Sequence, residues 1–548
     1  MSANKVKTET PILVIMGNPP YSGISANMGE WIVKLIEDYK VVDGKPLGER
    51  KHWLQDDYVK FIRFAQWKIS KAGQGILAFV TNHGYLDNPT FRGMRQSLLN
   101  SFTDIYILNL HGSSKKKEKC PDGSKDENVF DIQQGVAIGI FVKEAGNTCQ
   151  ARVHYADLWG LRDSKYDFLG TNSVESTEWQ ELKPHSPDYF FVPRQEGLTE
   201  EYEQSWSVKD IFSVNSTGIV TARDHFVIDF NREALSGRIE SFRSGRETFG
   251  LKDTGTWKLE EARRELQKLE NPSEFIQECL YRPFDTRWLF YHPTVIEGPR
   301  SKVMRHMLAG RNMGLITTRQ VSSGQFEHSF CSDKIIESCA ISDKTKEINC
   351  LFPLYLFFDE KARPLPEPVP NLNLEFLRLV EERTGRSRSP EDIFYYIYGI
   401  LYTPAYRTRY NEFLKYDFPR IPVFDGPAFE RISQLGSGLV ELHLMRGSFP
   451  RPRVCYPISG TDIVKKVEYN EASKRVWIND TQSFEGVEPS AWEYHIGGYQ
   501  VLDKWLKERK KWGKPLTLEM IEHFQQVHEI LLATIDLQAK LDEAWPLR

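Results

Sequence analysis

The chain has 548 residues, which is too long for one ordinary domain and predicts two or three hydrophobic cores. Hydrophobic residues make up 40% of it and charged residues 27%, a composition that excludes large-scale disorder. A formal net charge of −4 excludes a protein that is basic throughout, although a large DNA-binding enzyme needs only a local basic face.

The first 160 residues show strands alternating with helices. Apolar runs predict strands at 12–16, 75–81, 105–110 and 136–142, and the first of these is expected to be a buried parallel strand. Helical periodicity marks 31–39, 57–70 and 91–100. In the second of these helices, one face is predicted to carry Tyr58, Phe61, Ile62, Ala65 and Ile69. The alternation predicts a doubly wound α/β sheet.

Later segments are less regular. A Lys- and Ser-rich stretch at 113–128 predicts an exposed loop, in which Lys115, Lys116, Lys117 and Lys119 are candidates for phosphate contact or simple solvation. Residues 157–198 are rich in Pro and Ser and indicate a domain boundary. Helices are predicted at 391–414, interrupted at Pro404, and over most of 498–541, and a small hairpin is predicted at 464–477.

Cysteine usage and the N-terminus bear on location and metal binding. The seven cysteines are scattered, and no two have C-x-x-C spacing, so we expect no disulfide framework, no zinc site and no bound metal. The apolar run at 12–16 is too short to span a bilayer. We therefore expect a soluble, cytoplasmic protein without membrane contact.

The motif that indicates chemistry is Asn18-Pro19-Pro20-Tyr21, directly after the first predicted strand. Ligands of open α/β sheets bind beyond the carboxyl ends of the strands. Two prolines stiffen the chain there and remove two backbone donors, Asn18 adds a side-chain acceptor, and Tyr21 adds a flat aromatic face. This set suits a planar base that carries an amino group.

In this interpretation the base stacks on Tyr21, and its amine donates hydrogen bonds to the Asn18 side-chain oxygen and the Pro19 carbonyl. These bonds draw the amine nitrogen out of conjugation, so that its lone pair can attack a methyl sulfonium. Catalysis then comes from alignment and placed acceptors, and the base must first leave the duplex. The plainer alternative is a Pro-Pro turn with locally packed tyrosine. Placement after a strand favours the catalytic interpretation.

Asn-Pro-Pro-Tyr after a hydrophobic strand resembles the catalytic motif of amino-methyltransferases that modify adenine in DNA. Further stretches resemble Type ISP restriction-modification enzymes, namely 57–65, 75–82, 215–224, 281–288, 398–401, 417–422 and 497–499. The resemblance spans residue 11 to about 540. It implies an α/β fold, with a partial Rossmann-like methyltransferase sheet followed by an α+β target recognition domain and a helical C-terminal region.

The resemblance also implies domains and ligands. We expect a methyltransferase catalytic half at 1–160, a linker at 161–200, a target recognition domain at 201–460 and a C-terminal specificity and helical region at 461–548. The catalytic residues implied are Asn18, Pro19, Pro20 and Tyr21. The cofactor implied is S-adenosyl-L-methionine, the substrate an adenine flipped out of double-stranded DNA, and the setting a restriction-modification system.

One part of the family pattern is not found in the sequence. Family members hold the cofactor mainly on a Gly-rich loop ahead of Asn-Pro-Pro-Tyr, and only 17 residues precede Asn18. The nearby Gly73-Gln74-Gly75 precedes a strand and predicts an ordinary turn. Two explanations stay open: a second, upstream polypeptide carries the cofactor loop, helicase and nuclease, or the gene is truncated or mis-started. The sequence assigns no cofactor-binding residue.

Basic residues between 282 and 320 are the candidates for DNA contact. Arg and Gln suit paired contacts with guanine and adenine edges, and Lys and Arg neutralise phosphates. The candidates are Arg282, Arg287, Arg300, Lys302, Arg305, Arg319 and Gln320. The alternative for each arginine is a stacked surface position or an internal ion pair. A basic helix at 504–511 is a further candidate, or a solvated face.

Two other functions stay open. A chain without its own cofactor loop could be a DNA-binding specificity module without catalysis, and an adjacent upstream reading frame that encodes the loop would argue against this. Asn-Pro-Pro-Tyr also serves methyltransferases of RNA and protein. The long recognition segment argues against those substrates.

Overall fold

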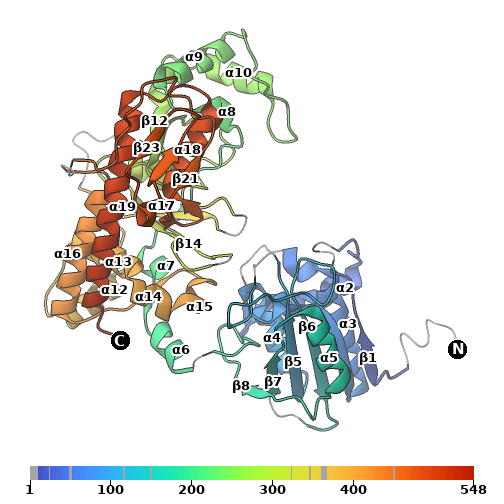
Figure 1. Ribbon diagram of the computed structural model, residues 1–548. Helices are drawn as coiled ribbons and strands as arrows, with labels where there is room; N and C mark the ends of the chain where they lie inside the picture. The colour runs from blue at the N-terminus through green and yellow to red at the C-terminus, as the bar shows by residue number, and fades with distance from the viewer. Residues whose placement is uncertain are drawn as a thin grey trace. The chain divides into compact units, whose positions relative to one another are not determined.

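The computed structural model describes residues 10–547 except 22, 24, 48–51, 115–117, 148–150, 195, 323, 345–346, 359–366 and 448–450. The chain divides into two compact units, which we call unit 1 (Met1–Glu196) and unit 2 (Gly197–Arg548) (Figure 1). None of the described helices is both long and apolar enough to cross a membrane.

Unit 1 is built on a six-stranded mixed sheet in the order β1-β4-β6-β5-β7-β8 (Figure 1). Its strands are β1 (Val14–Gly17), β4 (Gly75–Asn82), β5 (Asp104–His111), β6 (Val136–Lys143), β7 (Arg152–Asp157) and β8 (Gln180–Leu182). β1 is parallel to β4 and β5 is parallel to β7, whereas β6 and β8 run antiparallel to their neighbours. The four predicted strands are confirmed, within a sheet that is mixed in direction.

Helices cover both faces of this sheet. They are α2 (Glu30–Ile36), α3 (Asp57–Ala72), α4 (Arg92–Leu99) and α5 (Arg162–Thr171). Residues of α3 and α4 form one core with Leu77 and Ile105, and α5 packs on the other face beside Leu108 and Val136. The hairpin β2 (Val41–Val42) and β3 (Lys45–Pro46) and four 3-10 turns complete the unit.

The predicted face of α3 is confirmed with one exception. Tyr58, Ile62, Ala65 and Ile69 are buried, whereas Phe61 is exposed. The helix ends at Gly73, whose φ of +81° forms a left-handed cap that most side chains avoid. The predicted turn at Gly73-Gln74-Gly75 is therefore confirmed.

The prediction that the first strand is buried is wrong. β1 lies at the edge of the sheet, where β4 is its only partner among the described strands. Leu13 is 47%, Val14 58% and Met16 77% exposed. An apolar run fits a strand covered on both faces, but how far it is buried depends on neighbours that the run itself does not reveal.

Unit 2 contains two four-stranded sheets, ordered β10-β17-β14-β15 and β11-β13-β12-β16. Their strands are β10 (Ser216–Thr217), β11 (Ile228–Asp229), β12 (Ile276–Arg282), β13 (Asp285–Phe290), β14 (Gly314–Thr318), β15 (Ser329–Ser332), β16 (Ile335–Ile336) and β17 (Asn349–Pro353). Smaller pairings join β9 (Trp206–Ser207) to β20 (Arg420–Ile421), β18 (Tyr355–Leu356) to β19 (Val369–Pro370), and β24 (His495–Ile496) to β25 (Tyr499–Gln500).

The helices of unit 2 pack against these sheets and against one another. They are α6 (Glu196–Glu203), α7 (Val208–Ile211), α8 (Asp224–Val227), α9 (Arg232–Arg243), α10 (Leu259–Gln267), α11 (Ser301–Leu308), α12 (Leu374–Thr384), α13 (Pro390–Tyr402), α14 (Pro404–Arg409), α15 (Asn411–Leu414), α16 (Gly426–His443), α17 (Pro489–Trp492), α18 (Val501–Trp512) and α19 (Leu518–Ala544). The predicted break at Pro404 and the helical C-terminal segment are confirmed. So is the predicted hairpin, as β21 (Glu468–Asn470) and β22 (Arg475–Trp477), with β23 (Ser483–Glu485) as a third strand.

Two hydrophobic cores stabilise unit 2. The first, which we call the sheet core, contains residues from Ile219 to Leu351 and also residues from Val454 to Leu531. The second, the helix core, is centred on α13 and α16. α19 contributes Phe524 and Leu531 to the sheet core and Leu541 to the helix core. One core therefore includes residues on both sides of position 460.

The close packing of α13 against α16 predicts the effect of one substitution. A Cβ atom added at Gly436 would lie 2.0 Å from the backbone oxygen of Tyr395. We expect Gly436→Ala to lower the free energy of unfolding by about 1–3 kcal/mol, because the two helices must move apart. Urea unfolding measures this.

Gly438 in the same helix is the matched control. Its added Cβ meets only the Leu537 side chain, at 3.4 Å. Gly438→Ala is expected to be neutral, or to stabilise by up to about 1 kcal/mol through helix propensity. Equal effects of the two substitutions would contradict the packing argument.

Candidate active site and nucleic-acid surface

The polar groups of unit 1 gather where three strands end. β1 and β4 are parallel, with Gly17 opposite Phe79, and β4 and β5 both run antiparallel to β6. Asn82 and His111, the last residues of β4 and β5, both pair with Val136. The carboxyl ends of β1, β4 and β5 therefore lie along one edge of the sheet, the position at which α/β proteins bind ligands.

The Asn18-Pro19-Pro20-Tyr21 corner continues from the end of β1. Asn18 and Pro20 are exposed, Tyr21 is half-buried and Pro19 is buried. The Tyr21 hydroxyl lies 2.8 Å from Asn18 Oδ1 and 3.0 Å from the backbone oxygen of Val80 in β4, and these two acceptors share its single proton. The corner is thus attached to the sheet by a tyrosine, and its asparagine faces solvent.

Burial keeps the Tyr21 hydroxyl protonated. Burial raises the pKa of Tyr21 to about 12, so at neutral pH the group remains a hydrogen-bond donor. The Tyr21 ring lies edge-on to Tyr58, with ring centroids 6.3 Å apart. Asn18 Oδ1 accepts from Tyr21 and, as an amide oxygen with two lone pairs, has capacity for a second donor.

Two of the seven DNA-contact candidates lie inside unit 2. Arg282 and Arg287 are each less than a tenth exposed. Arg282 pairs with Glu337 at 2.8 Å, and Arg287 with Asp285 at 2.7 Å and with Glu508 at 3.0 Å. Both guanidinium groups also lie 3.9 Å from the centre of the Tyr281 ring. These arginines are internal ion-pair partners, the alternative that the sequence left open.

The next three candidates lie together on the surface. Arg300 precedes α11, and Lys302 and Arg305 occupy the exposed side of that helix. The opposite side is buried through Val303, Met304, His306 and Met307. Arg319 pairs with Asp417 at 2.9 Å and is partly exposed, as is Gln320. The structure therefore brings three cations together around α11.

The lysine-rich loop and the C-terminal basic helix differ from expectation. Lys115, Lys116 and Lys117 lie outside the described residues, and Lys119 is exposed. The ends of the loop are not exposed as predicted, because Ser113 and Asn128 are buried. In α18, Arg509 is 5% exposed and pairs with Asp285 at 2.7 Å. The solvated face predicted there therefore does not include Arg509.

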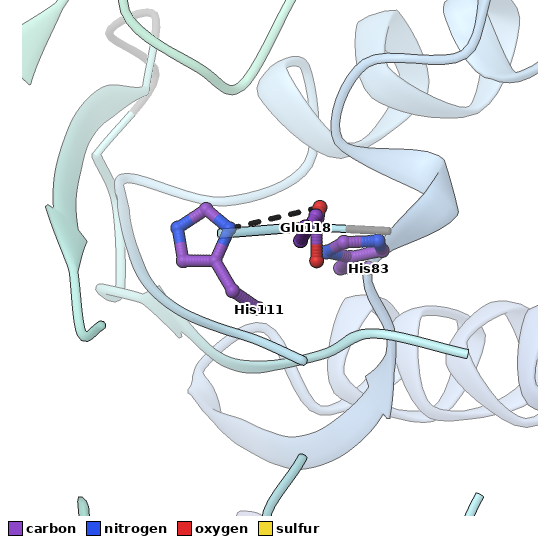
Figure 2. A group of neighbouring side chains, drawn as sticks. All are labelled: His83, His111 and Glu118. Atoms are coloured by element: carbon purple, nitrogen blue, oxygen red, sulfur yellow. Dashed lines mark ion pairs between the residues drawn. The ribbon is translucent and has the colours of Figure 1, made fainter. Parts of the chain in front are cut away.

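Sequence reasoning missed three residues at the carboxyl edge of unit 1. His83 and His111 stand at the ends of β4 and β5, and Glu118 lies in the loop after β5 (Figure 2). The sequence signal that could have indicated them was a histidine just after each of two predicted strands. Their separation along the chain matches no metal-binding motif, and only the strand order brings them together.

The buried ion pairs of unit 2 predict a pH dependence. Burial alone raises the pKa of Asp285, but Arg509 and Arg287 more than offset this and lower it to about 2. Because this value is below the usual 3.8, the carboxylate stabilises the fold above about pH 4, and the contribution is lost as pH falls toward 2.

We expect Asp285→Asn to lower the free energy of unfolding at pH 7 by about 3–5 kcal/mol, because it leaves buried guanidinium charge without its partner. Between pH 7 and pH 3 its stability should also fall less steeply than that of wild type, by about 1 kcal/mol, because roughly half of the Asp285 contribution is lost by pH 3. Urea unfolding between pH 7 and pH 3 measures both. Asp480→Asn is the control, because that carboxylate is 94% exposed and pairs with Lys466 at 3.4 Å. A similar loss in both variants would contradict the assignment.

Comparison with known structures agrees with this architecture. The ATP-dependent Type ISP restriction-modification enzyme LlaBIII bound to DNA matches with a TM-score of 0.75 and 22% identity over 98% of this chain and 37% of that one. The DrdV–DNA complex matches with a TM-score of 0.72 and 21% identity, over 98% and 57%. A nuclease-deletion mutant of the Type ISP enzyme LlaGI, with a DNA substrate mimic, matches with a TM-score of 0.70 and 22% identity, over 98% and 53%.

These likenesses show a shared mixed α/β fold, and this chain spans between about a third and three fifths of the length of those proteins. No curated protein matches the sequence. The family model of the Type ISP C-terminal specificity domain matches residues 210–534, which is more than half of the chain and nearly all of unit 2. The chain therefore belongs to the Type ISP restriction-modification family, and carries its C-terminal specificity domain.

Proposed function

We propose that this chain is the acceptor-binding and target-recognition part of an adenine-specific DNA methyltransferase in a restriction-modification system. The observation that carries the proposal is the solvent-facing Asn18 corner at the carboxyl end of β1. Family membership supports the setting, and the first two matched solved structures are DNA complexes.

The corner can bind and orient an exocyclic amine. Tyr21 holds Asn18 by a hydrogen bond and is itself held by Val80, so the asparagine oxygen has a defined position. An adenine amine that donates to this oxygen and to the Pro19 carbonyl has its nitrogen lone pair turned out of the ring plane. The base must be extruded first, which costs a few kcal/mol, and stacking on an aromatic ring returns on the order of 1–3 kcal/mol.

S-adenosyl-L-methionine is the methyl donor in this proposal and supplies an electrophilic methyl group when bound. Among the described residues of unit 1, the polar groups around Asn18 suit the adenine amine that receives the methyl group. The same residues contain no Gly-rich loop between a strand and a helix that would hold the methyl donor. The described residues of unit 1 therefore fit the base that is methylated and do not fit S-adenosyl-L-methionine.

Unit 2 is proposed to hold the duplex. Arg300, Lys302 and Arg305 are exposed on and just before α11, where their positive charges suit phosphates. Arg319 and Gln320 are the remaining proposed contacts. A specificity module without catalysis is the second candidate, and it is favoured by the extent of the family match, which begins at residue 210 and leaves out the Asn18 corner.

Substitutions in the Asn18-Pro19-Pro20-Tyr21 corner distinguish a methyltransferase part from a specificity module without catalysis. In a host that expresses the complete locus, Asn18→Ala or Tyr21→Ala should reduce adenine methylation by on the order of 10²–10³-fold, because the acceptor that orients the amine or its aromatic support is removed. Duplex binding by the purified chain should not change. Asn147→Ala, an exposed asparagine of unit 1, is the control. Full methylation in the Asn18 variant would reject the proposed role.

The basic surface is tested by the salt dependence of binding. Lys302→Ala combined with Arg305→Ala should weaken duplex binding and reduce the slope of log affinity against log salt by about 1 for each lost phosphate contact. The double variant Arg264→Ala, Lys268→Ala removes the same charges from the exposed side and end of α10. If both pairs change the slope equally, α11 is not the contact surface.

A further inference from the structure

We propose that His83, His111 and Glu118 form a binding site for a divalent transition-metal ion of the zinc type. The three side chains converge from the ends of β4 and β5 and from the loop after β5 (Figure 2). One ligand atom from each lies within 4.8 Å of the others, and His111 Nδ1 is 3.9 Å from Glu118 Oε1. Nothing in the proposed methyl transfer uses these groups.

His111 has a nitrogen that the described protein does not satisfy. The residue is 6% exposed, and its Nδ1 atom is buried without a hydrogen-bond partner among the described residues. The other ring nitrogen, Nε2, lies 2.7 Å from Asp157 Oδ1, and the Trp159 ring stacks on the imidazole with centroids 3.3 Å apart. A carboxylate on one nitrogen fixes the ring and leaves the opposite nitrogen as a ligand.

The other two ligands are oriented in the same way. His83 is 6% exposed, its Nδ1 lies 3.2 Å from Asn109 Oδ1, and its ring lies against Gly135, where a Cβ atom would approach within 2.4 Å. Glu118 Oε2 accepts a hydrogen bond from the backbone N–H of Ser113 at 2.7 Å. Each ligand thus has a second contact that orients it, as is usual in protein metal sites.

The donor set identifies the class of ion. Two imidazoles and one carboxylate bind Zn²⁺ at sites where a fourth position stays open to water, and imidazole ligands also suit other late first-row ions. Ligand atoms about 2.1 Å from a tetrahedral ion lie about 3.4 Å apart, so the separations between ligand atoms need to shorten by at most about 1.4 Å. Buried Nδ1 of His111 gains a partner, and the Glu118 carboxylate offsets part of the ion's charge.

Described residues of the loop between β5 and β6 are held in place near this position. Lys165 pairs with Asp126 at 2.6 Å with both side chains fully buried, and Asp126 accepts from the N–H of Gly112 at 2.7 Å. An ion bound to Glu118 would attach the same loop to the ends of β4 and β5. The site would then hold the loop that borders the carboxyl edge on which Asn18 lies.

The test is a Zn²⁺ titration of the full chain, stripped of metal and assayed against a chromophoric chelator. Wild type should bind one Zn²⁺ per chain. His83→Gln, His111→Gln and Glu118→Gln should each abolish or strongly weaken this binding, and Asp157→Asn should weaken it about 10–100-fold through His111. His154→Gln is the control, because His154 also lies near a carboxylate, 3.4 Å from Asp104, but outside the cluster.

Thermal unfolding provides the second readout. Zn²⁺ should raise the Tm of wild type and of His154→Gln, but not that of His111→Gln, and melts in chelator establish that the variants are folded. The proposal is overturned if wild type binds no Zn²⁺, or if binding and the Tm shift persist in His111→Gln and Glu118→Gln. Neither DNA nor methyl donor is present, so the outcome is independent of the proposed methyl transfer.

Discussion

The hydrogen bond from Tyr21 to the backbone of Val80 is the interaction on which the proposed chemistry of unit 1 depends. β1 is short, lies at the edge of the sheet and is attached through one parallel pairing with β4. Two prolines after it cannot donate to a neighbouring strand. The tyrosine therefore attaches the corner to β4 directly, and its hydroxyl also sets the position of the Asn18 oxygen.

Unit 2 buries charged side chains in its interior, where their desolvation costs free energy. Arg287, Arg509, Asp285 and Glu508 are buried together, and Arg282 with Glu337 lies nearby in the same unit. Such groups are tolerated only when each charge is paired and hydrogen-bonded, so the removal of one partner costs more than the pair contributes. This network joins β13 to α18, which are far apart in the sequence.

Local patterns predicted the elements well, and tertiary neighbours explain the errors. The strands of unit 1, the break at Pro404 and the C-terminal helices follow from periodicity and from proline chemistry. The burial of β1 did not, because no pattern within residues 12–16 reveals that the strand lies at an edge. Arg282 and Arg287 look the same in sequence whether they face a phosphate or a buried carboxylate.

The candidate site likewise has one part that local sequence predicts and one part that depends on tertiary structure. The Asn18 corner could be found because its four residues are contiguous and follow a strand. The cluster of His83, His111 and Glu118 could not, because β6 has to insert between β4 and β5 before the ends of those two strands are brought near each other. Contiguous motifs are visible to sequence reasoning, whereas sites assembled by strand order are not.

The sheet core of unit 2, which draws residues from both sides of position 460, has a practical consequence for engineering. A chimera that exchanges only residues up to position 460 would build the sheet core from side chains of two different parents. The apolar side chains of the two parents would not be matched in size and shape. Transplanting recognition between relatives therefore requires the segment from Gly197 through the end of α19 to be moved as one cassette.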